Sequence, residues 1–399
     1  MSYLILLETN KVPPRKSEIE SSLASYHGRR HCVLANRGTT ALTAALHSLD
    51  RPGEGVVFPA TLCSIPVFSA AFAGMKPLFA DVDLETGNFD LVSLENVLSL
   101  HRPAAVVPVH MFGLPEDMDA VGSLADRFGA SVIEDGALSM GASRNGRRVG
   151  GGGRMSCLSF VRKMIPLEMG GAVLTDDPAL AEKARAFVDG LTPMPPGRDA
   201  ETAAAMKAFH SLTGYAASGG WKRRELLAPF QGEFLRLLLT STTEEDWADS
   251  IVLRELANLD DAVKARRARA EVYEGSLVHP RIVPMKHDGS CFFAYPVRLL
   301  GISAEGFLSF ASTRGFSFKR IAYPDVSPIF LENPGSFPHA ALLEKELIGF
   351  PVDDDQPVSS FWEYAADFVK LLEEYLAAAP MLHPYDWRGK LEGRIGSQP

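Results

Sequence analysis

An aspartate and a lysine in the first half of the chain have the types and the order that covalent cofactor chemistry needs. Asp135 ends a strand-like apolar run, and Lys163 follows the pair Ser159-Phe160. A lysine amine can form a Schiff base with a cofactor aldehyde, and a buried carboxylate can keep a pyridinium nitrogen protonated, so that the ring acts as an electron sink. This order is typical of pyridoxal phosphate (PLP) chemistry, although an isolated lysine after a core strand is usually only a surface residue.

A glycine turn with two hydroxyls lies closer to the N-terminus. Gly38 is followed by Thr39 and Thr40, after an apolar run at 31–35 and before an Ala- and Leu-rich stretch at 41–49. The free N–H groups and the positive dipole end of a helix start form a phosphate site. Gly38 would let the backbone approach the anion, and a threonine would add a hydroxyl. Taken alone, such a turn is usually only a helix cap.

Apolar runs alternate with amphipathic stretches between these two features. Strands and helices are expected in turn at 55–59, 64–73, 76–81, 91–100, 104–110, 117–128 and 131–135. The alternation predicts an α/β fold with a mostly parallel sheet that helices cover on both faces. Ligands bind outside the carboxyl ends of the strands in such sheets. His110 and Asp135 fall at such ends and are therefore candidate site residues.

The stretch from about Val12 to Asp177 resembles the DegT/StrS-type aminotransferases, which are fold-type-I PLP enzymes that often aminate keto-sugars. The segments that match the family's motifs follow the family's order: 38–42, 58–61, 79–83, 107–113, 132–137 and 159–171. No single segment is specific, but the shared order and the spacing from acid to lysine together are strong evidence. The resemblance implies a seven-stranded type of sheet sandwiched by helices, with a smaller C-terminal α+β domain.

The resemblance also implies roles for individual residues. Lys163 would be the Schiff-base lysine and Asp135 the partner of the pyridinium nitrogen, which makes them the catalytic pair. Arg37 and His110 are candidates for substrate contact, and no metal site is expected. The cofactor-binding residues would be Gly38, Thr39, Thr40, Leu62, Asp135, Leu138, Ser159 and Lys163, with the phosphate on Gly38, Thr39 and Ser159.

Several positions depart from the family's pattern. Leu62 replaces an aromatic residue that packs on the cofactor ring, and Leu138 replaces a glutamine near the cofactor's phenolic oxygen. Arg37 replaces the serine of the phosphate loop, and the spacing from Ser159 to Lys163 is one residue shorter than in the commonest form. No segment matches the Asn-Tyr-Arg-Met motif that reaches a partner subunit's active site. These departures leave the substrate and the reaction type open.

The expected organisation has two domains and a tail. A large PLP-binding α/β domain is expected at 1–250, a small C-terminal α+β domain at 251–380 and a polar tail at 381–399. A segment rich in Pro, Gly and Ala at about 190–245 is expected to be an insertion in the large domain. Helical spacing at 246–277 places leucine and valine on one face and arginine on the other, which predicts a long helix that links the domains.

The composition is that of a globular enzyme. The chain has 399 residues and a formal charge of −9, which argues against a nucleic-acid partner. Its four cysteines (Cys32, Cys63, Cys157 and Cys291) are scattered without metal-type spacing, as expected of reduced thiols in a cytoplasmic protein. Neither a signal peptide nor a membrane-spanning run is expected. The glycines at 150–153 lack a following apolar helix, which argues against a dinucleotide loop.

The sequence therefore predicts a PLP-dependent aminotransferase that acts on the carbonyl of a sugar-like, cyclitol-like or other small biosynthetic intermediate. Its expected partners are a small-molecule amino donor, a carbonyl acceptor and a second copy of the chain. In this homodimer the region Pro193–Phe234 would lie near the partner's cofactor, and its basic cluster Trp221–Arg224 is a candidate anion contact.

Other functions stay open beside this one. The first alternative is PLP-dependent elimination, dehydration or carbon–carbon bond chemistry in secondary metabolism. The second is a catalytically silent PLP-fold protein with a binding or regulatory role. Leu62 and Leu138 make the expected pocket apolar, and Arg37 offers it a cation. This combination favours an acceptor that is smaller or less hydroxylated than a nucleotide-linked hexose and is anchored by an anionic group.

Overall fold

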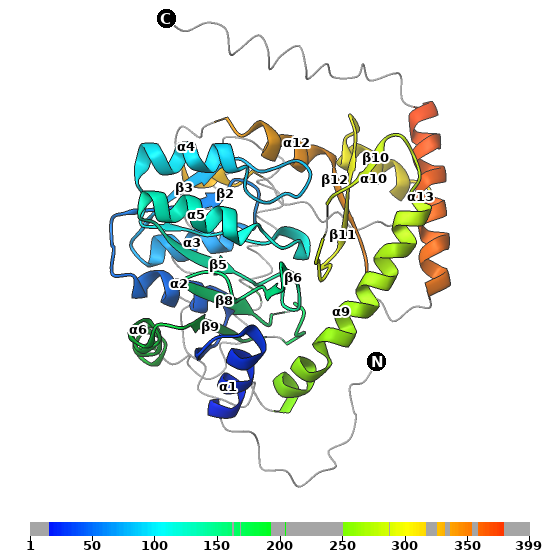
Figure 1. The fold of residues 1–399 in the computed structure, drawn as a ribbon. Helices are drawn as coiled ribbons and strands as arrows, with labels where there is room; N and C mark the ends of the chain where they lie inside the picture. The colour runs from blue at the N-terminus through cyan, green and yellow to red at the C-terminus, as the bar shows by residue number, and fades with distance from the viewer. Residues whose placement is uncertain are drawn as a thin grey trace, which may run out of the picture.

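A seven-stranded sheet forms the centre of the large domain (Figure 1). The computed structural model describes residues 16–161, 163–167, 169–192, 204, 250–286, 288–316, 325–331, 336–352 and 358–378. The strands lie in the order β1-β9-β8-β5-β4-β2-β3. Their bounds are β1 (His31–Ala35), β2 (Gly55–Pro59), β3 (Lys76–Ala80), β4 (Ala105–Val106), β5 (Ser131–Asp135), β8 (Met155–Ser159) and β9 (Gly171–Thr175).

The sheet is parallel from β8 across to β3, and only β9 runs against its neighbours. The predicted mostly parallel sheet is therefore confirmed. The reversal has a simple cause, because the chain between β8 and β9 is too short to hold the crossover helix that a parallel pair requires. Lys163 lies in this short connection. The Phe160 N–H donates to the Gly170 carbonyl at 3.0 Å, and the connection is thus closed at its base.

Helices cover both faces of the sheet, as the alternating sequence predicted. One face packs against α2 (Gly38–Ser48), α3 (Ser64–Phe72) and α6 (Pro178–Asp189), and the other against α1 (Lys16–His27), α4 (Leu91–His101) and α5 (Met118–Phe128). Successive strand residues serve opposite faces, because side chains alternate along a strand. Val56 and Phe58 enter the core under α2 and α3, whereas Val57 between them packs under α4 and α5.

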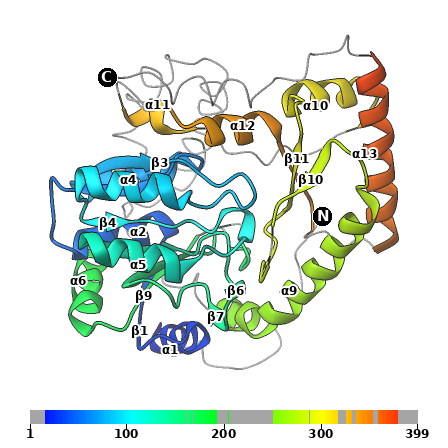
Figure 2. The ribbon, with the colours of Figure 1, turned by 45° about the horizontal axis from the view of Figure 1, so that its top comes forward.

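A second, smaller unit follows in the C-terminal part of the chain. Its antiparallel sheet has the order β10-β11-β12, and α10 and α13 pack on it to form a separate core. Figure 2 shows this unit beside the large sheet, with α12 between them. The bounds are β10 (Ile282–Pro284), β11 (Tyr295–Leu299), β12 (Leu347–Phe350), α10 (Ala304–Ser312), α11 (Ser327–Phe330), α12 (Pro338–Glu346) and α13 (Val358–Ala378).

The helix α9 (Ser250–Ser276) links the two units, as the sequence predicted (Figures 1 and 2). Its first half enters the large core through Val252, Leu256, Leu259 and Val263. Its second half enters the small core, where Tyr273 is fully buried. No helix in the described ranges has the length and apolar composition to cross a bilayer.

The arginines of α9 do more than face solvent. Arg266 donates to the Phe292 carbonyl at 2.9 Å, Arg267 to the Ser290 carbonyl at 2.7 Å and Arg269 to the Val352 carbonyl at 2.9 Å. Guanidinium groups thereby satisfy backbone carbonyls in the irregular segments of the small unit. The segment Ser290–Phe292 is held by two of these arginines, which matters for the site described below.

Short elements complete the described fold. The 3-10 turn η1 (Met111–Gly113) follows β4, and a hairpin of β6 (Ser143–Arg144) and β7 (Arg147–Arg148) precedes the glycines at 150–153. The expected insertion at about 190–245, apart from its first residues and position 204, lies outside the described residues, and so does the tail at 381–399.

A buried histidine at the end of α1 is expected to make the fold acid-sensitive. His27 is 3% exposed, and its Nδ1–H donates to the Val149 carbonyl at 2.6 Å. Burial lowers its pKa from 6.5 to about 4. As the pH falls through this window the unfolded chain binds a proton that the folded chain does not, so the free energy of unfolding should drop by about 2 kcal/mol between pH 7 and pH 4.5. Urea unfolding of the wild type at pH 7 and pH 4.5 measures this loss.

His27→Asn is the matched variant, because a neutral amide can still donate to the Val149 carbonyl but does not titrate. It should lose less stability than the wild type between the same two pH values. Equal losses in the two proteins would show that His27 does not carry the effect.

Candidate active site

The structure brings Asp135 and Lys163 together at the carboxyl end of the sheet. Asp135 ends β5 and is 3% exposed, and its Oδ1 accepts the Ala137 N–H at 2.9 Å. Burial raises the pKa of Asp135 and lowers the pKa of Lys163, while the charge of each partly offsets the shift of the other. Lys163 is half-buried. A lysine in this setting is more often neutral at ordinary pH than a free one and is therefore a better nucleophile.

The start of α2 forms a close-packed cradle against β8 and β9. A Cβ atom on Gly38 would lie 2.5 Å from the Cβ of Ser159, and one on Gly171 would lie 2.6 Å from the Gly38 nitrogen. Only glycine fits at either position. The N-cap residue Arg37 gives no side-chain cap hydrogen bond to the first turn of α2. A helix start of this kind suits a phosphate group.

The predicted phosphate ligands lie at this cradle. Ser159 is 7% exposed beside Gly38. Thr39 is half-buried, whereas Thr40 has no exposed surface. The Thr39 hydroxyl is thus the better placed of the two for a ligand. Phosphate cradle, lysine and buried carboxylate together match the donor set that PLP requires, and the residues present fit the cofactor.

A cysteine that sequence reasoning passed over lies just before α3, close enough to Lys163 and Asp135 for their charges to act on it. Cys63 occupies the N-cap position of α3 and is half-buried, and the charges of Lys163 and Asp135 both act on its thiol. Its neighbour Leu62 is fully buried in the large core. Contact of Leu62 with the cofactor ring stays a prediction, and Cys63 joins it as a candidate. Leu138 is 6% exposed, and its carbonyl accepts the thiol of Cys291 at 3.6 Å.

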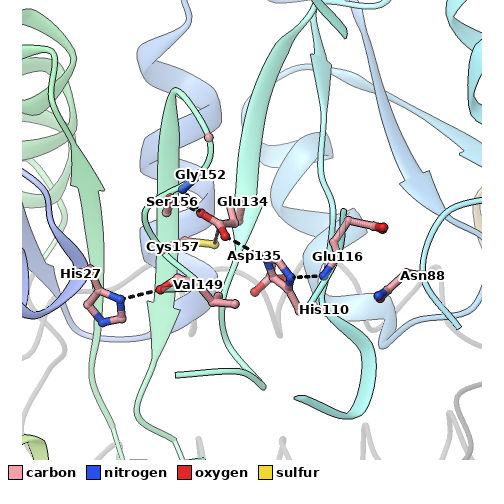
Figure 3. Close-up of polar contacts among 12 residues, drawn as sticks. His27, Asn88, His110, Glu116, Glu134, Asp135, Val149, Gly152, Ser156 and Cys157 are labelled. Atoms are coloured by element: carbon pink, nitrogen blue, oxygen red, sulfur yellow. Dashed lines mark hydrogen bonds and ion pairs between the residues drawn. The ribbon is translucent and has the colours of Figure 1, made fainter. Parts of the chain in front are cut away.

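A buried polar network lies behind the pair (Figure 3). His110 Nε2 lies 3.0 Å from Glu134 Oε1, and His110 Nδ1 accepts the Glu116 backbone N–H at 2.8 Å. The second bond leaves the ring proton on Nε2, the nitrogen that lies beside Glu134. Glu134 also accepts the Gly152 N–H and the Ser156 hydroxyl, each at 2.9 Å. The network therefore joins β4, β5, β8 and the glycine loop.

Burial alone would raise the pKa of Glu134, but the hydrogen bonds from His110 and from the backbone N–H groups of Gly152 and Gly150 hold it at about 2. Glu134 is therefore a carboxylate at any ordinary pH. Along β5 it points to the face opposite Asp135, because neighbouring strand residues alternate. The two adjacent acids thus have different surroundings: Glu134 accepts hydrogen bonds from Gly152 and Ser156, whereas Asp135 feels the charges of both His110 and Lys163.

The candidate substrate residues have different settings. His110 has no exposed surface, so its place in the structure is behind Asp135, and substrate contact stays a prediction. Arg37 is half-buried at the N-cap of α2, beside the phosphate cradle. The cluster Trp221–Arg224 and the expected partner-contact region Pro193–Phe234 lie outside the described residues, apart from position 204.

An aromatic ring beside Lys163 was not predicted. Lys163 Nζ lies 5.0 Å from the centre of the Phe293 ring, which belongs to the small unit. The sequence signal was only the aromatic pair Phe292-Phe293 before β11. Nothing along the sequence indicates where this pair docks.

Comparison with known proteins agrees with this geometry. The model of the DegT/DnrJ/EryC1/StrS aminotransferase family matches residues 9–218. The pleiotropic regulatory protein of Geobacillus stearothermophilus is 26% identical over 352 residues, which are 84% of this chain and 83% of that protein. The GDP-perosamine synthase of Caulobacter vibrioides is 36% identical over 170 residues, which are 42% of this chain and 46% of that enzyme. The chain thus spans under half the length of the second relative.

Solved structures share the fold. That of S. venezuelae DesV in complex with a ketimine intermediate is 24% identical, with a TM-score of 0.69 over 92% of this chain and 91% of that one. That of the E. coli GDP-4-keto-6-deoxy-D-mannose-3-dehydratase with bound hydrated PLP is 18% identical, with a TM-score of 0.67 over 88% and 91%. The predicted fold class is confirmed, and the expected cofactor agrees with the PLP bound in the dehydratase.

Proposed function

The chain belongs to the DegT/DnrJ/EryC1/StrS aminotransferase family, and on this basis we propose that it is a PLP-dependent aminotransferase. Its acceptor would be a carbonyl group of a sugar-like, cyclitol-like or other small biosynthetic intermediate. The observation that carries the proposal is the meeting of Lys163, Asp135 and the glycine cradle at one end of the sheet. A protein that had lost its chemistry would have no need to keep all three together.

Each of these residues would have its own role in binding the cofactor. Lys163 would hold the cofactor aldehyde, Asp135 the ring nitrogen, and Gly38, Thr39 and Ser159 the phosphate. When bound, PLP supplies a ring that accepts the electron pair released at the substrate carbon. The Asp135 carboxylate, buried from water, favours a protonated ring nitrogen. Lys163 Nζ, once free, would take the proton from the amino donor's carbon as base and deliver it as acid to the cofactor carbon that had carried the aldehyde, because its lowered pKa leaves a neutral fraction to act as base.

Other functions remain rivals because of particular relatives. A dehydratase shares the fold, which keeps elimination chemistry as the alternative reaction. A pleiotropic regulatory protein is among the relatives, which keeps a regulatory role as a second alternative. The buried Lys163–Asp135 pair favours catalysis over both a silent role and simple binding. Leu138, which stands where the family has a glutamine, does not by itself distinguish transamination from dehydration.

The experiment that separates these functions is a spectrum followed by a substrate panel. Purified protein with PLP should show a visible absorption band, and glutamate, the family's usual amino donor, should shift it. Each candidate acceptor is then added, and 2-oxoglutarate and the amine product are measured. Equal amounts of both would support transamination. Loss of water from the acceptor without an amine would support dehydration, and no spectral change with any donor would support the silent alternative.

The proposal extends to acceptor choice. Arg37 beside the phosphate cradle could bind an anionic handle, and the leucines at 62 and 138 offer substrate hydroxyls no hydrogen bond. An unpaired hydroxyl costs roughly 1–3 kcal/mol on desolvation, so a small anionic ketone should exceed a nucleotide-linked keto-hexose in kcat/KM. A kcat/KM at least about tenfold higher for the nucleotide-linked keto-hexose, a difference of about 1.4 kcal/mol, would contradict the proposed acceptor class.

The active form would be a cytoplasmic homodimer with shared sites. This follows from the family, since fold-type-I enzymes generally complete each site at a subunit contact. Light scattering at micromolar concentration should give the mass of two chains. A fully active monomer would contradict it.

A further inference from the structure

The small unit reaches the active-site lysine through one aromatic side chain. The ring centre of Phe293 lies 5.0 Å from Lys163 Nζ. Phe293 stands just before β11, and the lysine lies between β8 and β9. The ring is half-buried, whereas Phe292 beside it is 4% exposed and packs in the small core. An aromatic residue that served only the core would be placed like Phe292, so the position of Phe293 calls for another account.

Backbone hydrogen bonds hold the segment that carries this ring against the loop at 112–113. The Phe293 N–H donates to the Phe112 carbonyl at 2.9 Å, and the Cys291 N–H donates to the Gly113 carbonyl at 3.1 Å. The Ser290 hydroxyl donates to the same Gly113 carbonyl at 2.9 Å. A Cβ atom on Gly113 would lie 2.8 Å from the Phe293 nitrogen, so the approach of the two loops requires a glycine there.

Both loops hold strained residues at the contact. His110 and Phe112 have φ angles of 47° and 58° on one side, and Phe292 has a φ of 50° on the other. Non-glycine residues adopt this region only where surrounding structure compensates for it. Glu134 anchors the His110 ring, and Arg266 anchors the Phe292 carbonyl at 2.9 Å. Strain held from both sides at one contact is typical of a functional site rather than of ordinary packing.

We propose that Phe293 covers Lys163 and selects acceptors whose carbon next to the carbonyl carries hydrogen rather than a hydroxyl. The inference rests on the proposed aminotransferase function and names the substrate class as a deoxy or otherwise unhydroxylated ketone. An aromatic face packs well against C–H groups but offers a hydroxyl no hydrogen-bond partner. Phe293 thus sets specificity from the small unit, while the chemistry stays on the large one.

The first test is chemical modification of Lys163 in the full-length protein freed of cofactor. Cyanate is small and reacts with neutral amines, and peptide mass spectrometry gives its rate at Lys163 as a function of pH. In Phe293→Asn the rate at high pH should rise by about threefold or more, because the amine is uncovered. Phe293→Leu should stay near the wild type, since it restores an apolar cover.

The midpoint of the same pH profile gives a second readout. Burial is the largest influence on the pKa of Lys163, ahead of the charges of Cys63 and Asp135, the other groups that act on it among the described residues. Water admitted by Phe293→Asn should therefore raise the midpoint, while loss of the ring's attraction for the ammonium works the other way and is smaller. An unchanged rate and midpoint in Phe293→Asn would overturn the proposal.

Phe310→Leu is the matched control. Its ring also carries a cation, with the Arg314 guanidinium carbon 3.5 Å from the ring centre, but it lies on α10 of the small unit. It should leave Lys163 labelling unchanged. An equal change in this control would overturn the proposal, because the effect would then be general loosening of the small unit.

Acceptor choice completes the test. Pyruvate and 3-hydroxypyruvate both carry an anionic handle and differ by one hydroxyl on the carbon next to the carbonyl. With glutamate as donor, Phe293→Asn should shift the ratio of kcat/KM toward 3-hydroxypyruvate by about tenfold, mainly through KM. An unchanged ratio would overturn the selection. Faster labelling without transamination of any acceptor would instead count against the proposed function, so the two failures are distinguishable.

Discussion

Replacing Lys163 by alanine is expected to abolish covalent attachment of PLP and to lower turnover by about 10³-fold or more, because no other nucleophile takes its place. The fold should survive. Lys163 lies in a short connection outside the regular strands, and burial already disfavours its charge. The free energy of unfolding should therefore change by only about 1 kcal/mol.

Borohydride reduction in the presence of PLP, followed by peptide mapping, measures the attachment. Lys183→Ala is the matched control. This lysine lies on α6, its side chain is 52% exposed, and its ion pair with Asp50 is long, at 3.9 Å. It should be reduced and labelled like the wild type at Lys163. Labelling of a different lysine in the wild type would show that the assignment of Lys163 is wrong.

Replacing Asp135 by asparagine is expected to keep PLP bound but to lower turnover by about 10²–10³-fold, the cost of about 3–4 kcal/mol that follows from losing one preorganised polar partner in a dry site. Asparagine keeps the shape, and its Oδ1 can still accept the Ala137 N–H that now binds Asp135 at 2.9 Å. Its neutral amide no longer favours a protonated ring nitrogen. Turnover and PLP content of the purified variant measure the two effects separately.

The same variant has a second expected effect that does not depend on catalysis. The charge of Asp135 raises the pKa of Lys163 and so works against burial. Its removal should lower the pKa of Lys163 further, which cyanate labelling against pH would show. Turnover within about threefold of the wild type, less than 1 kcal/mol, would contradict the role of Asp135 in catalysis.

The sequence predicted the sheet and the meeting of Asp135 with Lys163 because both depend on local patterns. Apolar runs that alternate with amphipathic stretches predict a parallel sheet, and a parallel sheet places the ends of its strands along one edge. Asp135 at such an end and Lys163 near the next strand end therefore come together. The phosphate cradle at Gly38 follows equally from a turn before a helix, which is a local feature.

Other parts of the site depend on contacts between distant segments, which no pattern along the chain records. Phe293 reaches Lys163 only because its backbone bonds to Phe112, across a gap of well over a hundred positions. The exposure of Cys63 in place of Leu62 depends on how one loop turns into α3. His110 was noticed at a strand end, but its burial depends on Glu134 and on the backbone of Glu116.

The linking helix α9 has a consequence for how the protein comes apart. Val252 to Val263 are part of the large core, and Ala270 to Leu277 are part of the small one, within and just after a single continuous helix. Helix formation is cooperative, because the first turn costs free energy to form. A break in the middle of α9 would therefore destabilise the helix on both sides of the break. A cut between Val263 and Ala270 would leave each core segment with its own unit, but it would divide the helix that joins them. We therefore expect the large and small units to unfold in one cooperative transition.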